Sequence, residues 1–137
     1  MNLLNWNPEY ELGLETVDQQ HKQLFVIINE LIIATEYTRP NIELLPIVER
    51  LESYATSHFS AEEEIFDQIG FTGRSEHEAE HARFIDAVKY IRKQCKIIDA
   101  PMAPKMKDFL FNWLTHHILT KDKEYKLAMP TSHINIR

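Results

Sequence analysis

Histidine and glutamate recur in this sequence at spacings that suit metal binding. His58 and Glu62 are four residues apart, and so are His77 and His81. Four residues turn a helix by about 400°, so the two members of each pair lie one turn apart on nearly the same face. Imidazole nitrogens and carboxylate oxygens are donors that bind iron, zinc and other transition metals. Each pair is therefore a candidate half of a metal site.

The neighbouring residues indicate that these polar side chains face the protein interior. Each of them lies at a position that continues the apolar face of its predicted helix. A residue on the surface would instead lie on the opposite, polar face. The inward set comprises His21, His58, Glu62, His77, His81 and His117. A single pair of this kind lies on the protein surface more often than it binds a metal. A lone inward histidine is more often hydrogen-bonded to a backbone carbonyl than bound to a metal. Because an unpaired buried polar group costs about 2–7 kcal/mol, however, six such residues on four helices predict a shared metal centre.

Four stretches with helical periodicity carry these residues. They run from about 18 to 37, from 41–46 to 69, from 75 to 95, and from about 106 past 122, with proline or glycine between them. Thr16 with Gln19, and Ser75 with Glu78, have the spacing of a capping box at the first and third helix starts. The third stripe reads His77, His81, Phe84, Ile85, Val88 and Ile91. Four helices of similar length with short connections predict an all-α fold, an antiparallel up-down four-helix bundle.

Length and composition predict one domain and exclude several classes of function. The 137 residues suit a single domain over 1–137, with an N-terminal arm at about 1–17, the bundle at about 18–128 and a short C-terminal tail. We expect Trp6 and Tyr10 of the arm to pack over the helices. The net charge of −6, without a dense basic stretch, argues against nucleic-acid binding. No apolar stretch is long enough for membrane insertion.

The single cysteine and the N-terminal residues indicate the cellular compartment in which we expect the protein. Cys95 is the one cysteine, so it forms no internal disulfide, and we expect a buried helical residue rather than a redox switch. The first residues lack the basic-then-apolar pattern of a signal peptide. We therefore expect a cytoplasmic protein, and a monomer.

Asp122 does not fit the inner face by spacing alone. It follows His117 by five residues, which places it about 140° around a regular helix. Unless the helix shifts locally, this spacing predicts a surface charge beside the other charged residues of that segment. Four further residues are expected to be solvated: Glu63, Glu64, His116 and His133.

Taken together, these residues resemble the hemerythrin family, and more closely its single-domain bacterial members, the bacteriohemerythrins. The resemblance covers the chain from Trp6 to Tyr125. It rests on DQQHKQLF at 18–25, HFSAEE at 58–63, HEAEH at 77–81 and WLTHHILTKD at 113–122, in this order and spacing. It implies a four-helix bundle that holds two iron ions.

The resemblance also implies a role for each candidate ligand. His77, His81 and His117 would hold one iron, and His21 and His58 the other. Glu62 and Asp122 would bridge the two ions together with an oxo or hydroxo group, which gives Asp122 a role that its spacing does not predict. Dioxygen would bind at the open position of the second iron. The apolar residues around it would be Leu24, Phe59, Trp113, Leu114 and Ile118, for which plain core packing is a compatible interpretation.

One position departs from the family pattern: many relatives have methionine where this chain has Phe66. No ligand is lost, but we expect this change to alter the volume of the pocket or access to it.

The function that the resemblance implies is reversible dioxygen binding by a carrier, store or delivery protein that is not an enzyme. The residues agree, because di-iron bundles that activate oxygen use about four carboxylates and two histidines, whereas this chain offers five histidines and two carboxylates. One alternative is a di-iron enzyme or sensor on the same scaffold, which handles peroxide or nitric oxide or repairs iron centres. Another is a zinc-bound or metal-free structural bundle, although zinc prefers about four ligands in one tetrahedral site. A protein acceptor or reductase is not identified by the sequence.

Overall fold

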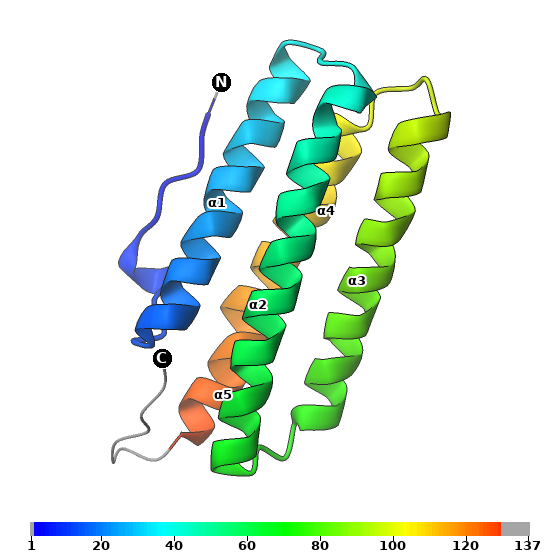
Figure 1. The fold of residues 1–137 in the computed structure, drawn as a ribbon. Helices are drawn as coiled ribbons and strands as arrows, with labels where there is room; N and C mark the ends of the chain where they lie inside the picture. The colour runs from blue at the N-terminus through cyan, green and yellow to red at the C-terminus, as the bar shows by residue number, and fades with distance from the viewer. Residues whose placement is uncertain (1, 130–137) are drawn as a thin grey trace.

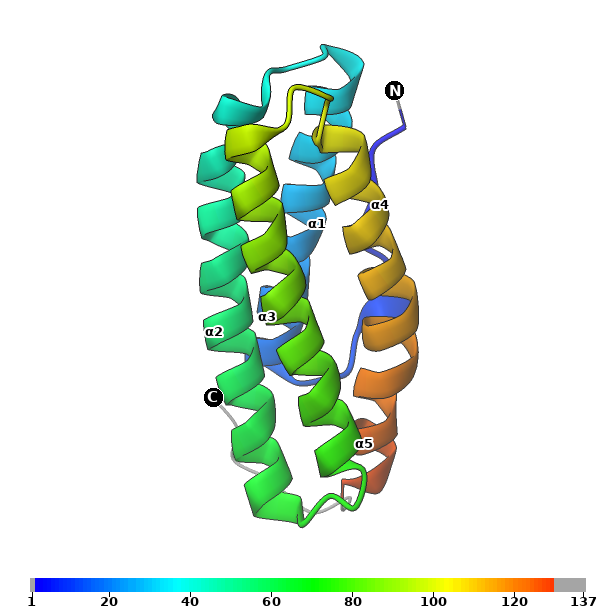
Figure 2. The same ribbon diagram turned by 90° about the vertical axis from the view of Figure 1, so that its right-hand side faces the viewer.

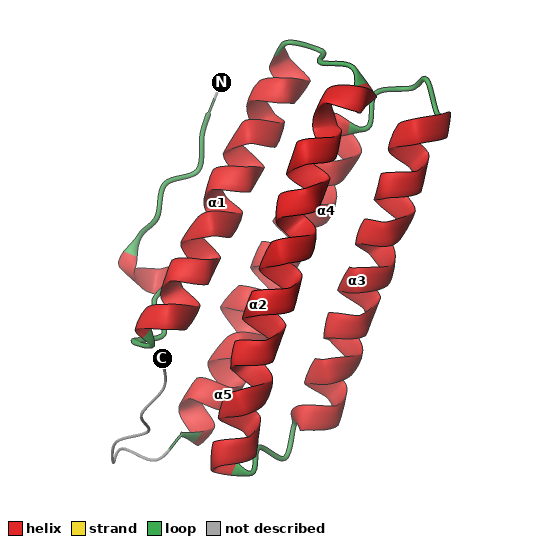
Figure 3. Cartoon of the chain, in the orientation of Figure 1, coloured by secondary structure: helices red, strands yellow, loops and turns green. Residues whose placement is uncertain are grey.

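The chain folds into four antiparallel helical rods (Figure 1). The computed structural model describes residues 2–129. The first three rods are α1 (Glu15–Glu36), α2 (Leu45–Ile69) and α3 (Arg74–Ile97), and the fourth is made of α4 (Ala103–Trp113), the segment η3 (Leu114–Lys121) and α5 (Asp122–Ala128). Two short 3₁₀ turns, η1 (Pro8–Tyr10) and η2 (Asn41–Leu44), precede α1 and α2. No strand occurs within the described residues, so the predicted all-α four-helix bundle is confirmed (Figure 3).

The rods do not pack equally closely on one another. The closest neighbours are α1 with α2, α2 with α3, and α1 with α4. The two remaining neighbours, α3 and α4, are spaced more widely (Figure 2). Short turns join the rods, and Gly70 ends α2 in the left-handed conformation at φ 61°, which suits glycine.

Both capping-box predictions are wrong. Helix α1 begins at Glu15, earlier than the expected start near Asp18, and neither α1 nor α3 has a side-chain hydrogen bond at its N-cap. Asp18 instead accepts hydrogen bonds from the backbone N–H groups of Leu12 at 2.9 Å and Gly13 at 3.1 Å. This carboxylate therefore fixes the arm to the start of α1, a tertiary role that local spacing does not reveal.

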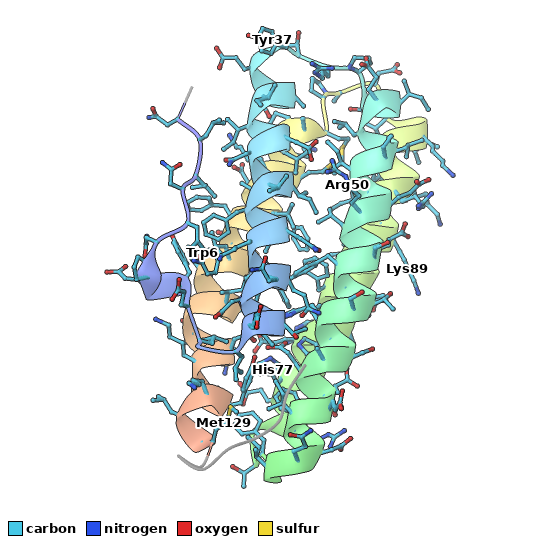
Figure 4. The ribbon with its side chains drawn as sticks, turned by 60° about the vertical axis from the view of Figure 1, so that its left-hand side comes forward. Trp6, Tyr37, Arg50, His77, Lys89 and Met129 are labelled. Carbon is cyan, nitrogen blue, oxygen red and sulfur yellow. The ribbon has the colours of Figure 1, made fainter. Side chains whose placement is uncertain are left out.

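The N-terminal arm packs along α1 as expected. The rings of Trp6 and Tyr10 meet Phe25 edge-on, with centroids 5.1 and 4.7 Å away (Figure 4). The backbone of Leu4 donates to Asn29 Oδ1 at 2.7 Å, and Asn29 Nδ2 donates back to Leu4 O at 3.0 Å. These contacts close one side of the bundle over α1.

The apolar interior forms two clusters. The larger fills most of the bundle, and the smaller gathers Val17, Ile65, Phe66 and Tyr125 at the end where α2 meets α3. One predicted core residue is misplaced, because Ile85 is 37% exposed while its neighbour Phe84 is buried. Adjacent residues point about 100° apart on a helix, and the buried stripe of α3 is too narrow to include both.

Two smaller predictions concern Cys95 and the membrane. Cys95 is buried in α3, as expected, and burial raises the pKa of its thiol. Within residues 2–129, no helix combines the length and the apolar character that crossing a lipid bilayer requires.

Candidate metal centre

Seven polar side chains meet inside the bundle between the two apolar clusters (Figure 4 labels His77 among them). All seven are at most 3% exposed. Helix α1 provides His21, α2 provides His58 and Glu62, α3 provides His77 and His81, and the fourth rod provides His117 and Asp122. The structure thus brings together every residue that the sequence and the family resemblance proposed as a ligand.

Asp122 is fully buried, which corrects the surface position that its spacing predicts. The reason is that η3 is a π-helix, in which hydrogen bonds join residues five apart. Residues five apart therefore lie one turn from each other, as His117 and Asp122 do. The backbone N–H of Asp122 donates to His117 O, which closes this turn. A widened helix at a functional site is a known use of the π-helical turn.

The candidate ligands form two groups that share Glu62. In each group, the donor atoms lie within 4.8 Å of one another. The first group is Glu62 with His77, His81 and His117, and the second is His21, His58, Glu62 and Asp122. Glu62 reaches both groups with the same oxygen: its Oε1 lies 2.9 Å from His81 Nε2 and 3.2 Å from His58 Nε2.

Asp122 reaches both groups with different oxygens. Its Oδ1 lies 2.8 Å from His117 Nε2 and 2.9 Å from His77 Nε2, while its Oδ2 lies 2.9 Å from His21 Nε2. One carboxylate oxygen therefore faces the three-histidine group and the other faces the two-histidine group. This division is the geometry that a carboxylate bridging two ions requires.

Electrostatic attraction outweighs burial at both carboxylates. Burial by itself raises the pKa of Glu62, but the imidazoles of His58, His117 and His77 hold that pKa well below its ordinary range. Burial and the negative charge of Glu62 raise the pKa of Asp122. The imidazoles of His117 and His21 lower this pKa by more, so the net shift is downward. Both carboxylates are thus ionised and available as ligands. Imidazoles bind a metal in their neutral form, so any proton that these histidines hold must leave when a metal binds.

The residues present fit a metal ion. All five histidines direct Nε2 at the two carboxylates, and among the described residues Glu62 Oε2, His117 Nε2 and both carboxylate oxygens of Asp122 make no hydrogen bond of good geometry. Burying so many polar atoms without full pairing is costly, and metal coordination offsets this cost. The donor set, rich in imidazole with two carboxylates, is consistent with iron.

Two further residues orient the histidines, and the sequence alone does not identify them. Gln20 Oε1 lies 2.9 Å from His58 Nδ1, and Glu80 Oε1 lies 3.3 Å from His117 Nδ1. Such partners fix the ring and its tautomer so that Nε2 faces the metal. The pairs are 38 and 37 residues apart, so no spacing within one helix could reveal them.

We expect the variant Gln20→Leu to bind iron about ten- to a hundredfold more weakly, because His58 loses the acceptor that orients it. Equilibrium competition with an iron chelator measures this affinity. Gln23→Leu, an exposed glutamine on the same helix, is the matched control and should keep the original affinity. Equal affinities in the two variants would remove Gln20 from the site.

The five residues proposed to line an oxygen pocket lie next to the ligands. Leu24, Phe59, Leu114 and Ile118 are buried, and Trp113 is half-buried. The ring of Phe59 stacks on His81 with centroids 3.8 Å apart, and Trp113 stacks on His117 at 3.9 Å. Their role toward dioxygen stays a prediction.

The remaining sequence predictions near the site concern residues outside the ligand set. Phe66 lies edge-on to His77 with centroids 4.9 Å apart, so a substitution at this position changes the packing around a candidate ligand. His116 and Glu64 are exposed and Glu63 is partly exposed, while His133 lies outside the described residues.

Comparison with known proteins agrees with this geometry. Residues 12–128 match the Hemerythrin HHE cation binding domain, which is most of the chain. The chain belongs to the hemerythrin family. The match begins just before α1 and ends at the last residue of α5, so it includes all seven candidate ligands of this hemerythrin.

Individual relatives support the same membership. A bacteriohemerythrin from Clostridium acetobutylicum is 35% identical over 88% of this chain and 96% of its own length. A hemerythrin-like protein from Naegleria gruberi is 28% identical over 89% of this chain and 90% of its own. The crystal structure of a wild-type hemerythrin superposes with a TM-score of 0.79 at 26% identity, covering 93% of this chain and 98% of the other.

Proposed function

We propose that this hemerythrin binds dioxygen reversibly at a centre of two iron ions, and that it carries, stores or delivers oxygen. The observation that carries the proposal is the division of Asp122 between the two histidine groups, with Glu62 shared by both. A single metal ion would not need two groups of donors joined by two carboxylates. His77, His81 and His117 would hold one ion, and His21 and His58 the other.

The unequal number of histidines leaves one ion with an open position. Two ferrous ions, when bound by these two groups of ligands, would supply the electrons that pass to dioxygen and return when dioxygen leaves. The ligands of this chain favour that return. Five neutral imidazoles and two carboxylates leave two ferrous ions with a formal charge of about +2, whereas four carboxylates would leave about 0. The less negative donor set stabilises high iron oxidation states less, which favours binding over oxidative chemistry.

Apolar side chains near the ligands would keep water from the open position. Leu114 is 1% exposed and Phe59 is 3% exposed, and both belong to the main apolar cluster. Excluding water limits the supply of protons that would drive irreversible oxidation of the centre. The same residues that form the core would therefore protect the function.

Enlarging this apolar region should speed oxidation in air. We expect Leu114→Ala to convert to the ferric form faster than the original protein, by about tenfold, because the cavity admits water. The half-time of the absorbance change in air measures this rate. Leu110→Ala, one turn further from the ligands in the same cluster, is the control. Both variants should lose about 2–5 kcal/mol of stability, so equal oxidation rates would mean that Leu114 has no protective role.

The direct test of the function is a visible absorption spectrum of iron-loaded protein, reduced without oxygen, then exposed to air, then flushed with argon. Colour that appears with oxygen and fades under argon is the expected result. Irreversible conversion to the ferric form would instead favour an enzyme that handles peroxide or nitric oxide, and turnover with these substrates would then identify it. An absence of bound iron would contradict the proposal altogether.

Residues 1–137 are proposed to act as one domain and as a monomer in a reducing, cytoplasmic compartment. The lone Cys95 is consistent with that compartment. Sedimentation of the iron-loaded protein tests the monomer, and a stable dimer at micromolar concentration would contradict it.

A further inference from the structure

A groove between α3 and the fourth rod reaches the candidate metal centre. Its volume is about 270 Å³, and His117 lies in its lining. Four other surface cavities in the described part of the chain are lined by none of the seven candidate ligands. A molecule in this groove would therefore lie closer to the centre than a molecule in the other four.

Aromatic rings connect the groove to His117. Phe84 and Phe109 line the groove with centroids 5.4 Å apart, and Phe84 lies 4.5 Å from Trp113. Trp113 is half-buried, lines the groove, and stacks on His117 at 3.9 Å with an angle of 10° between the rings. A flat molecule in this groove would lie against Trp113 and beside His117, one of the candidate ligands.

The charge at the groove is that of an arginine without a partner. Arg83 lines the groove and is exposed, and within residues 2–129 no carboxylate lies within 4.0 Å of it. The other four described arginines each pair with a carboxylate, in Arg39–Glu43, Arg50–Glu30, Arg74–Asp67 and Arg92–Glu52. The acidic residue of the groove, Glu80, is engaged by His117 at 3.3 Å and Lys121 at 4.0 Å. The free charge of the groove is therefore positive.

We propose that this groove binds a small planar anion that reduces the ferric protein, a molecule of the reduced-flavin type. The half-buried rings of Phe109 and Trp113 would contact its conjugated system, and Arg83 would pair with its phosphate or carboxylate. The volume lies close to the lower end of the range for small-molecule pockets, about 300 Å³, so the groove suits one ring system. A freely diffusing molecule is therefore the proposed occupant.

The inference rests on the proposed function, since a dioxygen carrier that oxidises in air must be reduced again. A reduced flavin releases two electrons and two protons as it becomes oxidised flavin. One electron would go to each of two ferric ions by way of Trp113 and His117, and the protons would pass to solvent. The electron count of the donor thus matches that of a two-iron centre.

The test compares flavin mononucleotide with riboflavin, which has the same ring system but no phosphate. Fluorescence titration of each oxidised flavin with ferric, iron-loaded protein gives the two dissociation constants. We expect flavin mononucleotide to bind about two- to fivefold more tightly, because an exposed ion pair contributes up to about fivefold. Arg83→Glu should abolish this preference. Lys89→Glu, the same charge reversal on the outer face of α3, should keep it (Figure 4).

The ratio of the two constants within each variant cancels general effects on folding. Equal ratios in Arg83→Glu and Lys89→Glu, or no saturable binding of either flavin below millimolar concentration, would overturn the inference. A second measurement follows the anaerobic reduction of ferric protein by reduced flavin mononucleotide, which should be about two- to fivefold slower in Arg83→Glu than in Lys89→Glu. Equal rates would overturn the electron-donor role. Neither measurement involves oxygen, so failure here is distinct from failure of reversible oxygen binding.

Discussion

Replacing Glu62 with glutamine should nearly eliminate iron binding, with a loss of affinity of more than about a hundredfold. Glu62 Oε1 lies within 3.6 Å of Nε2 of four histidines, from both groups. The neutral amide removes a negative charge that both ions would share, and amides are weaker ligands than carboxylates. Iron content per chain after desalting, together with the visible spectrum, measures the loss.

The matched control for this experiment is Glu64→Gln. Glu64 lies two residues further along α2 and is exposed, so the same chemical change there should leave iron content unchanged. Far-ultraviolet circular dichroism of both variants shows whether the helices are retained. Full iron occupancy in Glu64→Gln with an empty but helical Glu62→Gln is the expected pair of results. Normal iron content in Glu62→Gln would refute the bridging role.

Removing the metal should lower the melting temperature by at least about 10 °C. A ligand present at a thousand times its dissociation constant stabilises the folded state by about 4 kcal/mol, and each kilocalorie shifts the melting temperature by about 4 °C in a domain of this size. The metal-free protein also keeps site-facing atoms without a hydrogen-bond partner, among them Glu62 Oε2 and His117 Nε2, which adds to its instability. Calorimetry before and after treatment with a chelator measures the shift.

Restoring ferrous iron without oxygen should return the melting temperature to its first value. In Glu62→Gln the chelator should have little effect, since that variant is expected to hold little metal from the start. A chelator effect of equal size in both proteins would point to a metal bound elsewhere. An unchanged melting temperature in the original protein would mean that the buried cluster is stable by its own hydrogen bonds.

The sequence predicted the helical rods and their inner faces well, because both depend on local backbone geometry. A regular helix fixes the angle between residues four apart, so His58 with Glu62, and His77 with His81, could be placed on shared faces without a structure. The starts of α1 and α3 were predicted less well. There, Asp18 bonds to the arm rather than capping its own helix, and this choice depends on contacts outside the helix.

By itself, then, the sequence determined which side chains are ligand types and that they face inward on four helices. Three features were decided only by the tertiary structure. The π-helical turn η3 brings Asp122 onto the face of His117, Gln20 and Glu80 orient histidines of other rods, and Arg83 stands alone beside an aromatic groove. The physical reason is the same for all three. Spacing along one regular helix is a local property, whereas contacts between rods, and departures from regular helical geometry that those contacts stabilise, depend on how the whole bundle packs.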